Sequence, residues 1–326
     1  MCAAPLHHLT GSLYTVQVPI PYPMRTVTVL IDAASPVTLV DTSLNTPEAI
    51  ATLEDALAQL GLHWESIERV VLTHQHPDHA GLSGLIEERS GASVHLLDEN
   101  LQGGGLPWQH FEAWQGQERQ HLLAHGLPPA LLEGVEAEAR RTRDRVTLAT
   151  RLTPLTAGDQ LTLGGHRWTV LWLPGHADGH LGLWQPQLDL LIAGDAILPR
   201  ISPNVGLGAQ GRSDPLGDYL QTLERLRQLN PATAVVGHYG PTMSGVAERA
   251  AELSAHHHER LALVEETLRV TPMHAHQLSA VMFPRELDAR VRRFALTEAL
   301  AHAEHLRLKG LLDRRWTGDT WLYFGE

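Results

Sequence analysis

The stretch Val71-Leu72-Thr73-His74-Gln75-His76-Pro77-Asp78-His79-Ala80-Gly81 places three histidines and an aspartate within six consecutive positions. It continues a short β-branched run, so the first two histidines stand at the end of a predicted strand. Side chains two residues apart on an extended segment point the same way, so His74 and His76 can reach a single metal ion. Asp78 and His79 lie in the turn that follows, where they are offset enough to serve a second ion nearby. The chain carries 21 histidines in 326 residues, so this pattern needs support from elsewhere in the sequence.

That support comes from three further ligand-type residues that stand where other predicted strands end. His176 in LWLPGHADGH, Asp195 in LLIAGD and His238 in AVVGHYGP each follow an apolar run and a glycine. A site assembled from several strand ends is held on a rigid scaffold, and a glycine beside each ligand lets the backbone approach closely. Together with the first stretch, these positions predict one metal centre.

These motifs resemble those of the metallo-β-lactamase-fold hydrolases. The resemblance runs from LVDTS through HQHPDH, LPGHADGH and AGD to GHYGP, over roughly residues 13 to 245, and it fills every ligand position of the two-metal members. It implies an α/β fold, an αββα sandwich with the site at one edge between the two sheets. It also implies that one ion is held by His74, His76 and His176, that a second is held by Asp78, His79 and His238, and that Asp195 bridges the two.

Three more residues stand beside the predicted centre. Asp41 in LVDTS occupies a position where the family keeps a carboxylate near the site, although an ordinary Asp-Thr-Ser turn also explains it. His180 matches the second histidine of the family's PGHxxGH run, and we expect it to support the ligands. Tyr239 directly follows His238, where it could donate a hydrogen bond to an oxyanion or simply pack.

The charges of a two-metal centre favour hydrolysis. Two divalent cations lower the pKa of a shared water, and the bridging hydroxide that results attacks a carbonyl carbon or a phosphorus. His and Asp ligands suit zinc, manganese and iron, and we expect zinc, with the other two left open. Asp78 is the expected catalytic residue, because it can orient the hydroxide and pass its proton toward the leaving group.

The sequence predicts a hydrolase domain over residues 1–245 that carries an insertion over about 99–147. Two proline-initiated segments with helical spacing predict a helical hairpin in this insertion. Its aromatic residues Trp108, Phe111 and Trp114 share one predicted helix face, which packing explains better than a lid over the substrate.

A second predicted domain occupies residues 246–326. Three predicted helices precede a hairpin signal at Thr317-Gly318-Asp319, which is the order of elements in a winged helix. Consecutive His256, His257 and His258 point in three directions on a helix, so we expect a solvated face there. The isolated histidines are expected at the surface: His110, His121, His125, His274 and His276.

Composition limits the class of partner. The formal net charge is −12 with 43% hydrophobic residues, as in an ordinary globular protein that lacks an overall basic charge for nucleic acid. No apolar run approaches the length of a membrane span, and the first residues lack a signal-peptide pattern, so we expect a cytoplasmic protein without a membrane partner. The lone cysteine, Cys2, excludes an internal disulfide and is not expected to be catalytic.

Two enzymatic functions fit these observations. The first is hydrolysis of a small acyl thioester, ester or lactone, by resemblance to the glyoxalase II-like thioesterases and the lactonases, although a glutathione-binding tail is not evident. The alternative is an endoribonuclease or phosphodiesterase that uses the winged helix as its nucleic-acid contact. Residues 271–326 carry 8 basic and 7 acidic side chains, a poor phosphate clamp, so we prefer the acyl substrate. The C-terminal domain is then expected to pack, or to form a homodimer, as the insertion also could. A non-catalytic binding module is disfavoured because every ligand is retained.

Overall fold

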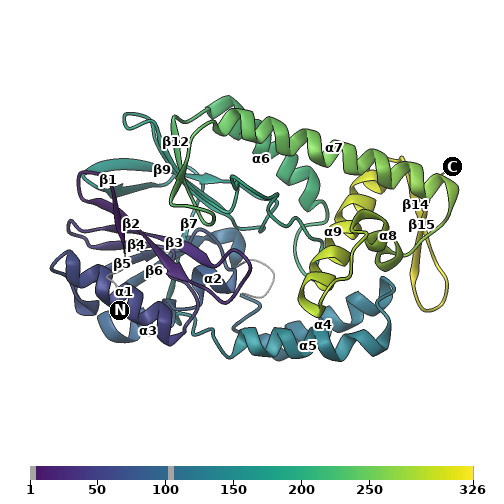
Figure 1. Ribbon diagram of the computed structural model, residues 1–326, viewed down its shortest axis with the longest axis horizontal. Helices are drawn as coiled ribbons and strands as arrows, with labels where there is room; N and C mark the ends of the chain where they lie inside the picture. Colours follow the sequence, from purple (N-terminus) through teal and green to yellow (C-terminus); the bar gives the residue numbers. More distant parts are fainter. Residues whose placement is uncertain (1–4, 102–105, 326) are drawn as a thin grey trace.

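The computed structural model describes residues 5–101 and 106–325, so Cys2 lies outside the described residues. Two sheets lie face to face, with helices on their outer sides (Figure 1). The first sheet contains, in spatial order, β1 (Leu6–Thr10), β2 (Leu13–Pro19), β3 (Thr26–Asp32), β4 (Thr38–Val40), β5 (Arg69–Val71), β6 (Ser93–Leu97) and β7 (Leu152–Leu155). The second contains β13 (Thr242–Met243), β12 (Thr233–Val236), β11 (Leu190–Gly194), β10 (Leu181–Gln185), β9 (His166–Trp172) and β8 (Gln160–Leu163). This αββα arrangement confirms the predicted fold class.

Alternate residues of the strands build the core between the two sheets. In β3, Leu30 joins the core between the sheets, whereas its neighbour Ile31 packs with the outer helices. In β11, Ile192 faces the other sheet and Leu191 faces outward. Because successive side chains on a strand point to opposite faces, a strand covered on both sides must be apolar throughout, as β11 is.

Helices cover both outer faces of the sandwich. On the first sheet lie α1 (Pro47–Gln59), α2 (Pro77–Ala80) and α3 (Ser83–Ser90), and the second is covered by α6 (Pro215–Leu229). Helix α6 begins where Asp214 accepts a hydrogen bond from the backbone N–H of Gly217 at 2.9 Å, which satisfies one of the free amides of its first turn. Short 3-10 turns occupy Trp64–Ser66 and Asp98–Asn100.

The ends of four strands position the candidate site. Strand β5 ends two residues before Thr73, β9 ends before the His176 loop, β11 ends immediately before Asp195, and β12 ends two residues before His238. Strands β4 and β5 run parallel, as do β11 and β12, so within each pair the carboxyl ends meet at one edge. Loops that follow such ends are the usual place for binding groups in open α/β sheets.

The predicted helical hairpin is present as α4 (Phe111–Ala124) and α5 (Pro129–Arg143). The expectation that Trp108 shares a helix face with Phe111 and Trp114 is wrong, because α4 begins only at Phe111. Its ring nevertheless stacks on that helix, with centroids 5.9 Å from Phe111 and 5.4 Å from Trp114. The three aromatic residues therefore form one packed cluster at the start of the hairpin.

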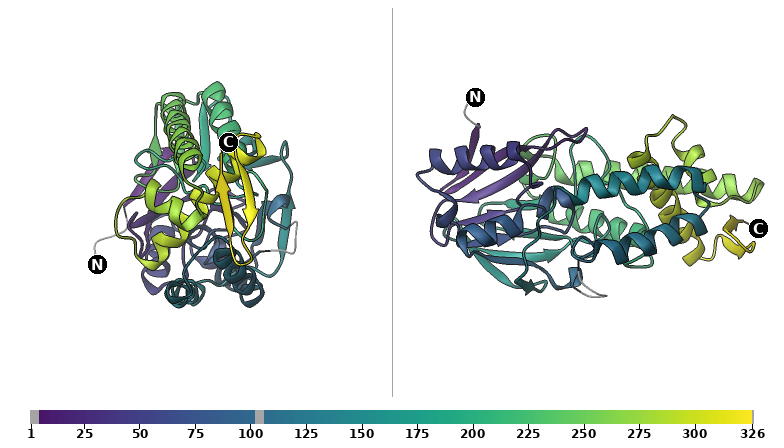
Figure 2. Two further views of the ribbon diagram at one scale, coloured as in Figure 1. Left: turned by 90° about the vertical axis from the view of Figure 1, so that its right-hand side faces the viewer. Right: turned by 90° about the horizontal axis from the view of Figure 1, so that it is seen from below.

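The C-terminal part contains α7 (Val246–Val270), α8 (Ala275–Met282), α9 (Ala289–Leu308) and the antiparallel pair β14 (Asp313–Trp316) and β15 (Trp321–Phe324). The predicted order of three helices and a hairpin is thus present. Helices α4 and α5 lie beside this part (Figure 2), and Arg293 of α9 donates a 2.8 Å hydrogen bond to the buried Glu118 of α4. The insertion and the C-terminal helices therefore pack as one layer.

The expectation of a solvated face at the histidine triplet is wrong for His257, whose side chain is fully buried. Its ring packs against Tyr219 of α6 and His302 of α9, each at 5.4 Å, because α7 is covered by both helices. Burial lowers the pKa of His257 to about 2, so it is neutral in the folded protein. His125 is likewise buried against Tyr323 rather than exposed.

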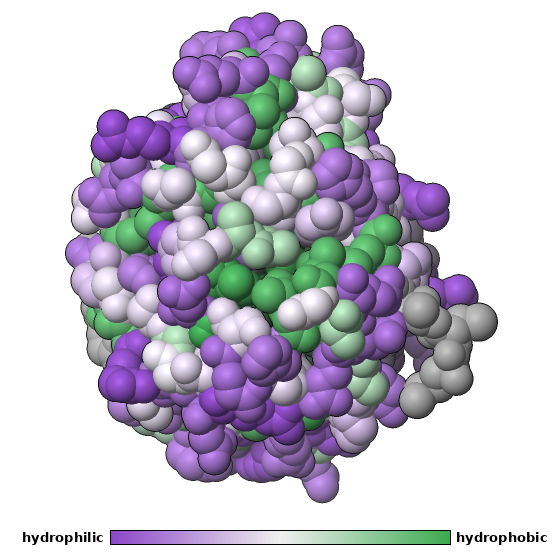
Figure 3. Space-filling model, turned by 90° about the vertical axis from the view of Figure 1, so that its left-hand side faces the viewer, coloured by the Kyte–Doolittle hydropathy of each residue, from purple (hydrophilic) through white to green (hydrophobic). Residues whose placement is uncertain are grey.

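Hydrophobic side chains also reach the surface. They form a band across the middle of the sandwich end of the molecule, the end farthest from α8 and α9 (Figure 3). Within residues 5–101 and 106–325, no helix combines the length and the apolar character needed to cross a membrane.

Candidate metal centre

Three histidine nitrogens converge on one point at the edge of the sandwich. His76 Nδ1 lies 2.9 Å from His74 Nε2 and 2.9 Å from His176 Nε2. All three residues are at least partly buried, and their ligand atoms lie within 4.8 Å of one another. Two of them come from the loop after β5 and the third from the loop after β9, and these are the three histidines that the family resemblance assigns to one ion.

The hydrogen bonds of the outer ring nitrogens show that the inward nitrogens of His74 and His176 carry no proton. His176 Nδ1 lies 2.8 Å from the carbonyl oxygen of Asn204, so it carries the proton and donates it there. His74 Nδ1 lies 3.0 Å from Thr73 Oγ1, whose own proton goes to Asp41 at 2.8 Å. The inward Nε2 atoms of both rings are therefore unprotonated acceptors. A single proton on His76 Nδ1 can serve only one of these two acceptors well, whereas a metal ion would accept the lone pairs of all three rings at once.

A second group of ligand atoms comes from Asp78, His79 and His238. Within this group, His238 Nε2 lies 3.4 Å from Asp78 Oδ2. The carboxylate of Asp195 lies between the two groups: its oxygens are 3.5 Å from His79 Nε2, 3.3 Å from His238 Nε2 and 3.7 Å from His176 Nε2. Oδ1 faces His79 of the second group, whereas Oδ2 lies between His238 of the second group and His176 of the first, so the carboxylate is placed where a bridging ligand would stand.

Unsatisfied polar atoms point into the same space. His79 Nε2, His238 Nε2 and Asp195 Oδ1 are buried and have no hydrogen-bond partner among the described residues. Buried polar atoms without partners are costly, so their clustering indicates a ligand. Gly237 explains how the backbone comes so close, because a Cβ there would lie 2.0 Å from Asp195 Oδ1. The donor set of imidazole and carboxylate groups suits one or two divalent cations.

The pKa values of these residues reflect the same charge balance. Burial opposes protonation of His79, but the carboxylates of Asp195 and Asp41 outweigh it and raise its pKa to about 10. Burial is likewise outweighed at His238, where Asp195 and Asp78 raise the pKa to about 11. Protons on these imidazoles supply positive charge that bound cations would replace, so metal binding must release protons.

Asp41 contacts two neighbours of the centre. Its Oδ2 accepts a 2.8 Å hydrogen bond from His79 Nδ1, and its Oδ1 accepts one of 2.7 Å from the backbone N–H of Thr73. The bond to Nδ1 leaves Nε2 of His79 facing the centre. Thr73 was not among the predicted residues, although its place directly before His74 was a usable signal.

The two remaining predicted neighbours are placed differently. His180 is buried, stacks on His74 at 4.9 Å and accepts a 3.1 Å hydrogen bond from the backbone N–H of Asp195 at Nε2. It therefore fixes two candidate ligands. Tyr239 is only half-buried and has a positive φ of 65°, and its ring contacts the guanidinium group of Arg200.

Asp41→Asn is expected to weaken metal binding about 10- to 100-fold, because the amide cannot orient His79 as the carboxylate does. Competition with a chromophoric chelator measures the affinity. Asp32→Asn is the matched control, since Asp32 is also a buried carboxylate that accepts hydrogen bonds, from Ser12 at 2.5 Å and Gly164 at 2.6 Å, but touches no candidate ligand. Equal metal affinity in the two variants would contradict the role assigned to Asp41.

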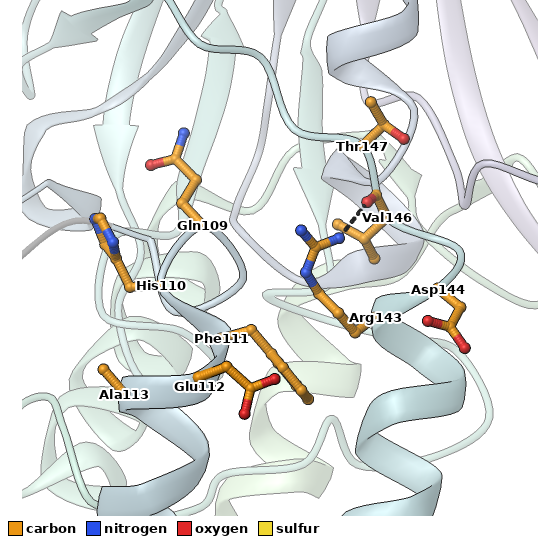
Figure 4. Close-up of a pocket in the computed structure, with 9 residues that line it drawn as sticks. All are labelled: Gln109, His110, Phe111, Glu112, Ala113, Arg143, Asp144, Val146 and Thr147. Carbon is orange, nitrogen blue, oxygen red and sulfur yellow. Dashed lines mark hydrogen bonds between the residues drawn. The ribbon is translucent and has the colours of Figure 1, made fainter.

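A separate hollow of about 740 Å³ lies between the start of α4 and the end of α5 (Figure 4). Its walls include His110, Phe111, Arg143 and Thr147, and Arg143 donates a hydrogen bond to the carbonyl of Val146. None of the seven candidate ligands lines it. The hollow is therefore distinct from the metal centre.

The fold and the ligand geometry agree with comparisons to known proteins. Residues 21–238 match the metallo-beta-lactamase superfamily, and residues 261–326 match the metallo-beta-lactamase-like C-terminal domain. The chain therefore belongs to the metallo-β-lactamase superfamily, and it is a metal-dependent hydrolase.

Individual relatives carry the comparison over the whole chain. The probable metallo-hydrolase YqjP of Bacillus subtilis is 29% identical over 321 residues, covering 97% of this chain and 98% of its own. The metallo-beta-lactamase family protein TTHA1429 from Thermus thermophilus is 41% identical in sequence to this chain. Its crystal structure superimposes with a TM-score of 0.87, covering 98% of this chain and 100% of the Thermus chain. The hydroxyacylglutathione hydrolase GloC of Haemophilus influenzae is 27% identical over 194 residues, 57% of this chain and 74% of its own.

Proposed function

We propose that the protein hydrolyses a small acyl substrate, a thioester, ester or lactone, with two divalent ions held at the centre described above. His74, His76 and His176 would hold the first ion, Asp78, His79 and His238 the second, and Asp195 both. The position of the Asp195 carboxylate between the two groups of ligand atoms is the observation that carries this proposal. We propose zinc as the ion, because its preference for imidazole and carboxylate ligands matches this set.

Bound ions of this kind supply an acidified water and polarise the carbonyl oxygen of a substrate. Asp78 would handle the proton. Burial favours its neutral form, but the imidazole of His238, 3.4 Å away, and the charge of His79 keep its pKa below the ordinary value, so it is a carboxylate at neutral pH. One oxygen of Asp78 can then accept the proton of the attacking water and pass it to the leaving sulfur or oxygen. The new carbon–oxygen bond forms as the old carbon–sulfur or carbon–oxygen bond breaks.

The pairing of basic side chains in the C-terminal part favours a small substrate over a nucleic acid. Arg293 pairs with the buried Glu118 at 2.8 Å. Arg307 and Arg314 both pair with the buried Glu304, at 2.8 and 2.6 Å. A guanidinium group committed to a buried carboxylate is a poor phosphate contact, because binding a phosphate would leave that carboxylate unpaired.

The name of one relative supports the acyl class. According to its name, the Haemophilus influenzae protein hydrolyses a hydroxyacylglutathione, and this substrate is a thioester. The likeness covers 57% of this chain. We therefore rank thioesters first among acyl substrates, without assigning the glutathione group.

A side-by-side assay of metal-loaded protein tests the proposal. The substrates are an acyl thioester, a lactone, a phosphodiester and single-stranded RNA. We expect turnover of the thioester or the lactone, with rates on the other two at background, and we expect His76→Ala to abolish that turnover. Cleavage of RNA alone would contradict the acyl proposal and favour the nuclease.

A further inference from the structure

Arg200 and Tyr239 meet on segments that follow two of the candidate ligands. Arg200 comes five residues after Asp195, and Tyr239 comes immediately after His238. The guanidinium carbon of Arg200 lies 5.8 Å from the centroid of the Tyr239 ring, a cation–π contact. The contact therefore links the loop after β11 to the loop after β12, at the rim of the metal centre.

The segment that carries Arg200 is held on both sides. Arg249 of α7 donates hydrogen bonds to the carbonyl oxygens of Leu198 at 2.9 Å and Ile201 at 3.0 Å. Asn204, farther along the same segment, accepts the 2.8 Å hydrogen bond from His176. These hydrogen bonds fix the backbone on both sides of Arg200, and two of them come from α7, in the C-terminal part of the chain.

Tyr239 is held just as firmly. Its φ of 65° is in the left-handed region, which is disfavoured for a residue with a large side chain. Thr28 of β3 forms hydrogen bonds with the backbone on both sides of Tyr239. The N–H of Thr28 donates to the carbonyl oxygen of Gly237 at 2.8 Å, and the hydroxyl of Thr28 donates to the carbonyl oxygen of Gly240 at 3.3 Å. Strain kept in place beside a ligand is characteristic of functional sites.

The charge of Arg200 is unpaired. Neighbouring arginines have carboxylate partners: Arg212 pairs with Asp218, and Arg249 pairs with Glu252. Over residues 5–101 and 106–325, no carboxylate comes within 4.0 Å of the Arg200 guanidinium, and its side chain is exposed. A planar guanidinium with free N–H groups binds a carboxylate through two parallel hydrogen bonds.

We propose that Arg200, backed by the Tyr239 ring, binds a carboxylate carried by the acyl substrate and so selects acidic acyl compounds. The inference rests on the proposed function, because the carboxylate of the substrate would bind Arg200 while the acyl carbonyl of the same molecule lies at the metal centre. It adds a specificity-determining residue to the hydrolase. A chain with a net charge of −12 repels acidic substrates at long range, so a local arginine would be needed to hold one.

Binding of small thiols to the zinc-loaded protein tests this without hydrolysis. A thiol binds zinc, so 3-mercaptopropionate carries a carboxylate at a fixed distance from the metal, and 3-mercaptopropanamide is its neutral counterpart. Titration calorimetry is expected to show the acid binding about 10- to 100-fold more tightly than the amide. Arg200→Gln should remove that difference and leave amide binding unchanged, whereas Arg200→Lys should retain part of it.

Arg167→Gln is the matched control, because Arg167 is also exposed but lies at the start of β9, at the opposite end of the strand from the His176 loop. It should leave both affinities unchanged. An acid preference that survives Arg200→Gln, equal weakening of both thiols, or no binding of either thiol to the wild-type protein would overturn the proposal. So would a loss of RNA binding in Arg200→Gln with thiol binding intact. An intact acid preference in a protein without acyl hydrolase activity would instead contradict the proposed function alone.

Discussion

Asp195→Asn is expected to reduce hydrolytic activity by about a thousandfold or more, which corresponds to several kcal/mol of lost transition-state stabilisation. Asp195 contacts His79 and His238 of the second group and His176 of the first, so its carboxylate lies between both groups of ligand atoms. An asparagine keeps the volume but loses the charge and one acceptor oxygen. Initial rates on the best thioester or lactone, at saturating metal, measure the effect.

Asp189→Asn is the control for this variant. Asp189 precedes the same strand, β11, at its other end, and it is exposed with a positive φ of 48° that asparagine also tolerates. Its activity should match that of the wild-type protein. If Asp195→Asn kept more than about a tenth of the activity, a loss below about 1.4 kcal/mol, the bridging role would be wrong.

Removal of metal is expected to lower the free energy of unfolding by about 4 kcal/mol for each ion that had been present at a thousand times its dissociation constant. The metal-free protein should stay folded at neutral pH. Asp195 and Asp78 then face protonated His79 and His238, whose pKa values are raised to about 10 and about 11, so the buried carboxylates remain paired. Urea unfolding before and after chelation, followed by circular dichroism, measures the change.

His76→Ala provides the comparison for the chelation experiment. It removes a ligand of the first group and leaves the second intact, so chelation should destabilise it less than the wild-type protein. Adding zinc back to the chelated wild-type protein should restore its original free energy of unfolding. Identical unfolding curves with and without metal would show that the centre contributes no binding free energy to the fold.

Much of the centre could be predicted from sequence because its ligands are marked by local patterns. His74, His76, Asp78 and His79 share one strand end, and each remaining ligand follows an apolar run that is recognisable as a strand. Strand ends in an α/β sandwich meet at one edge, so the pattern predicts proximity across long separations in the chain. The structure brings all of these residues together.

Contacts made through the backbone could not be predicted in the same way. His176 is oriented by the carbonyl oxygen of Asn204, and His238 by that of Thr26 at 2.7 Å. Every residue except its neighbours could supply such a carbonyl, so residue identity carries no signal. Only the path of the loops determines which carbonyl lies beside the ring.

The sequence also did not show which side chains of the helical part are buried. The three consecutive histidines on α7 were predicted to be exposed to solvent, because consecutive residues cannot share one helix face. Helices α6 and α9 nevertheless cover the side of α7 on which His257 lies. Trp108 was placed in a helix on spacing alone, and α4 starts three residues later. A homodimer through the C-terminal part or the insertion stays a prediction, to be tested by the oligomeric state in solution.

The metal content of the purified protein tests the central claim most directly. Elemental analysis after dialysis against metal-free buffer should find two divalent ions per chain, with zinc predominating, and about one in His76→Ala. Far fewer than two ions in the wild-type protein, after growth with zinc supplied, would contradict the two-metal account.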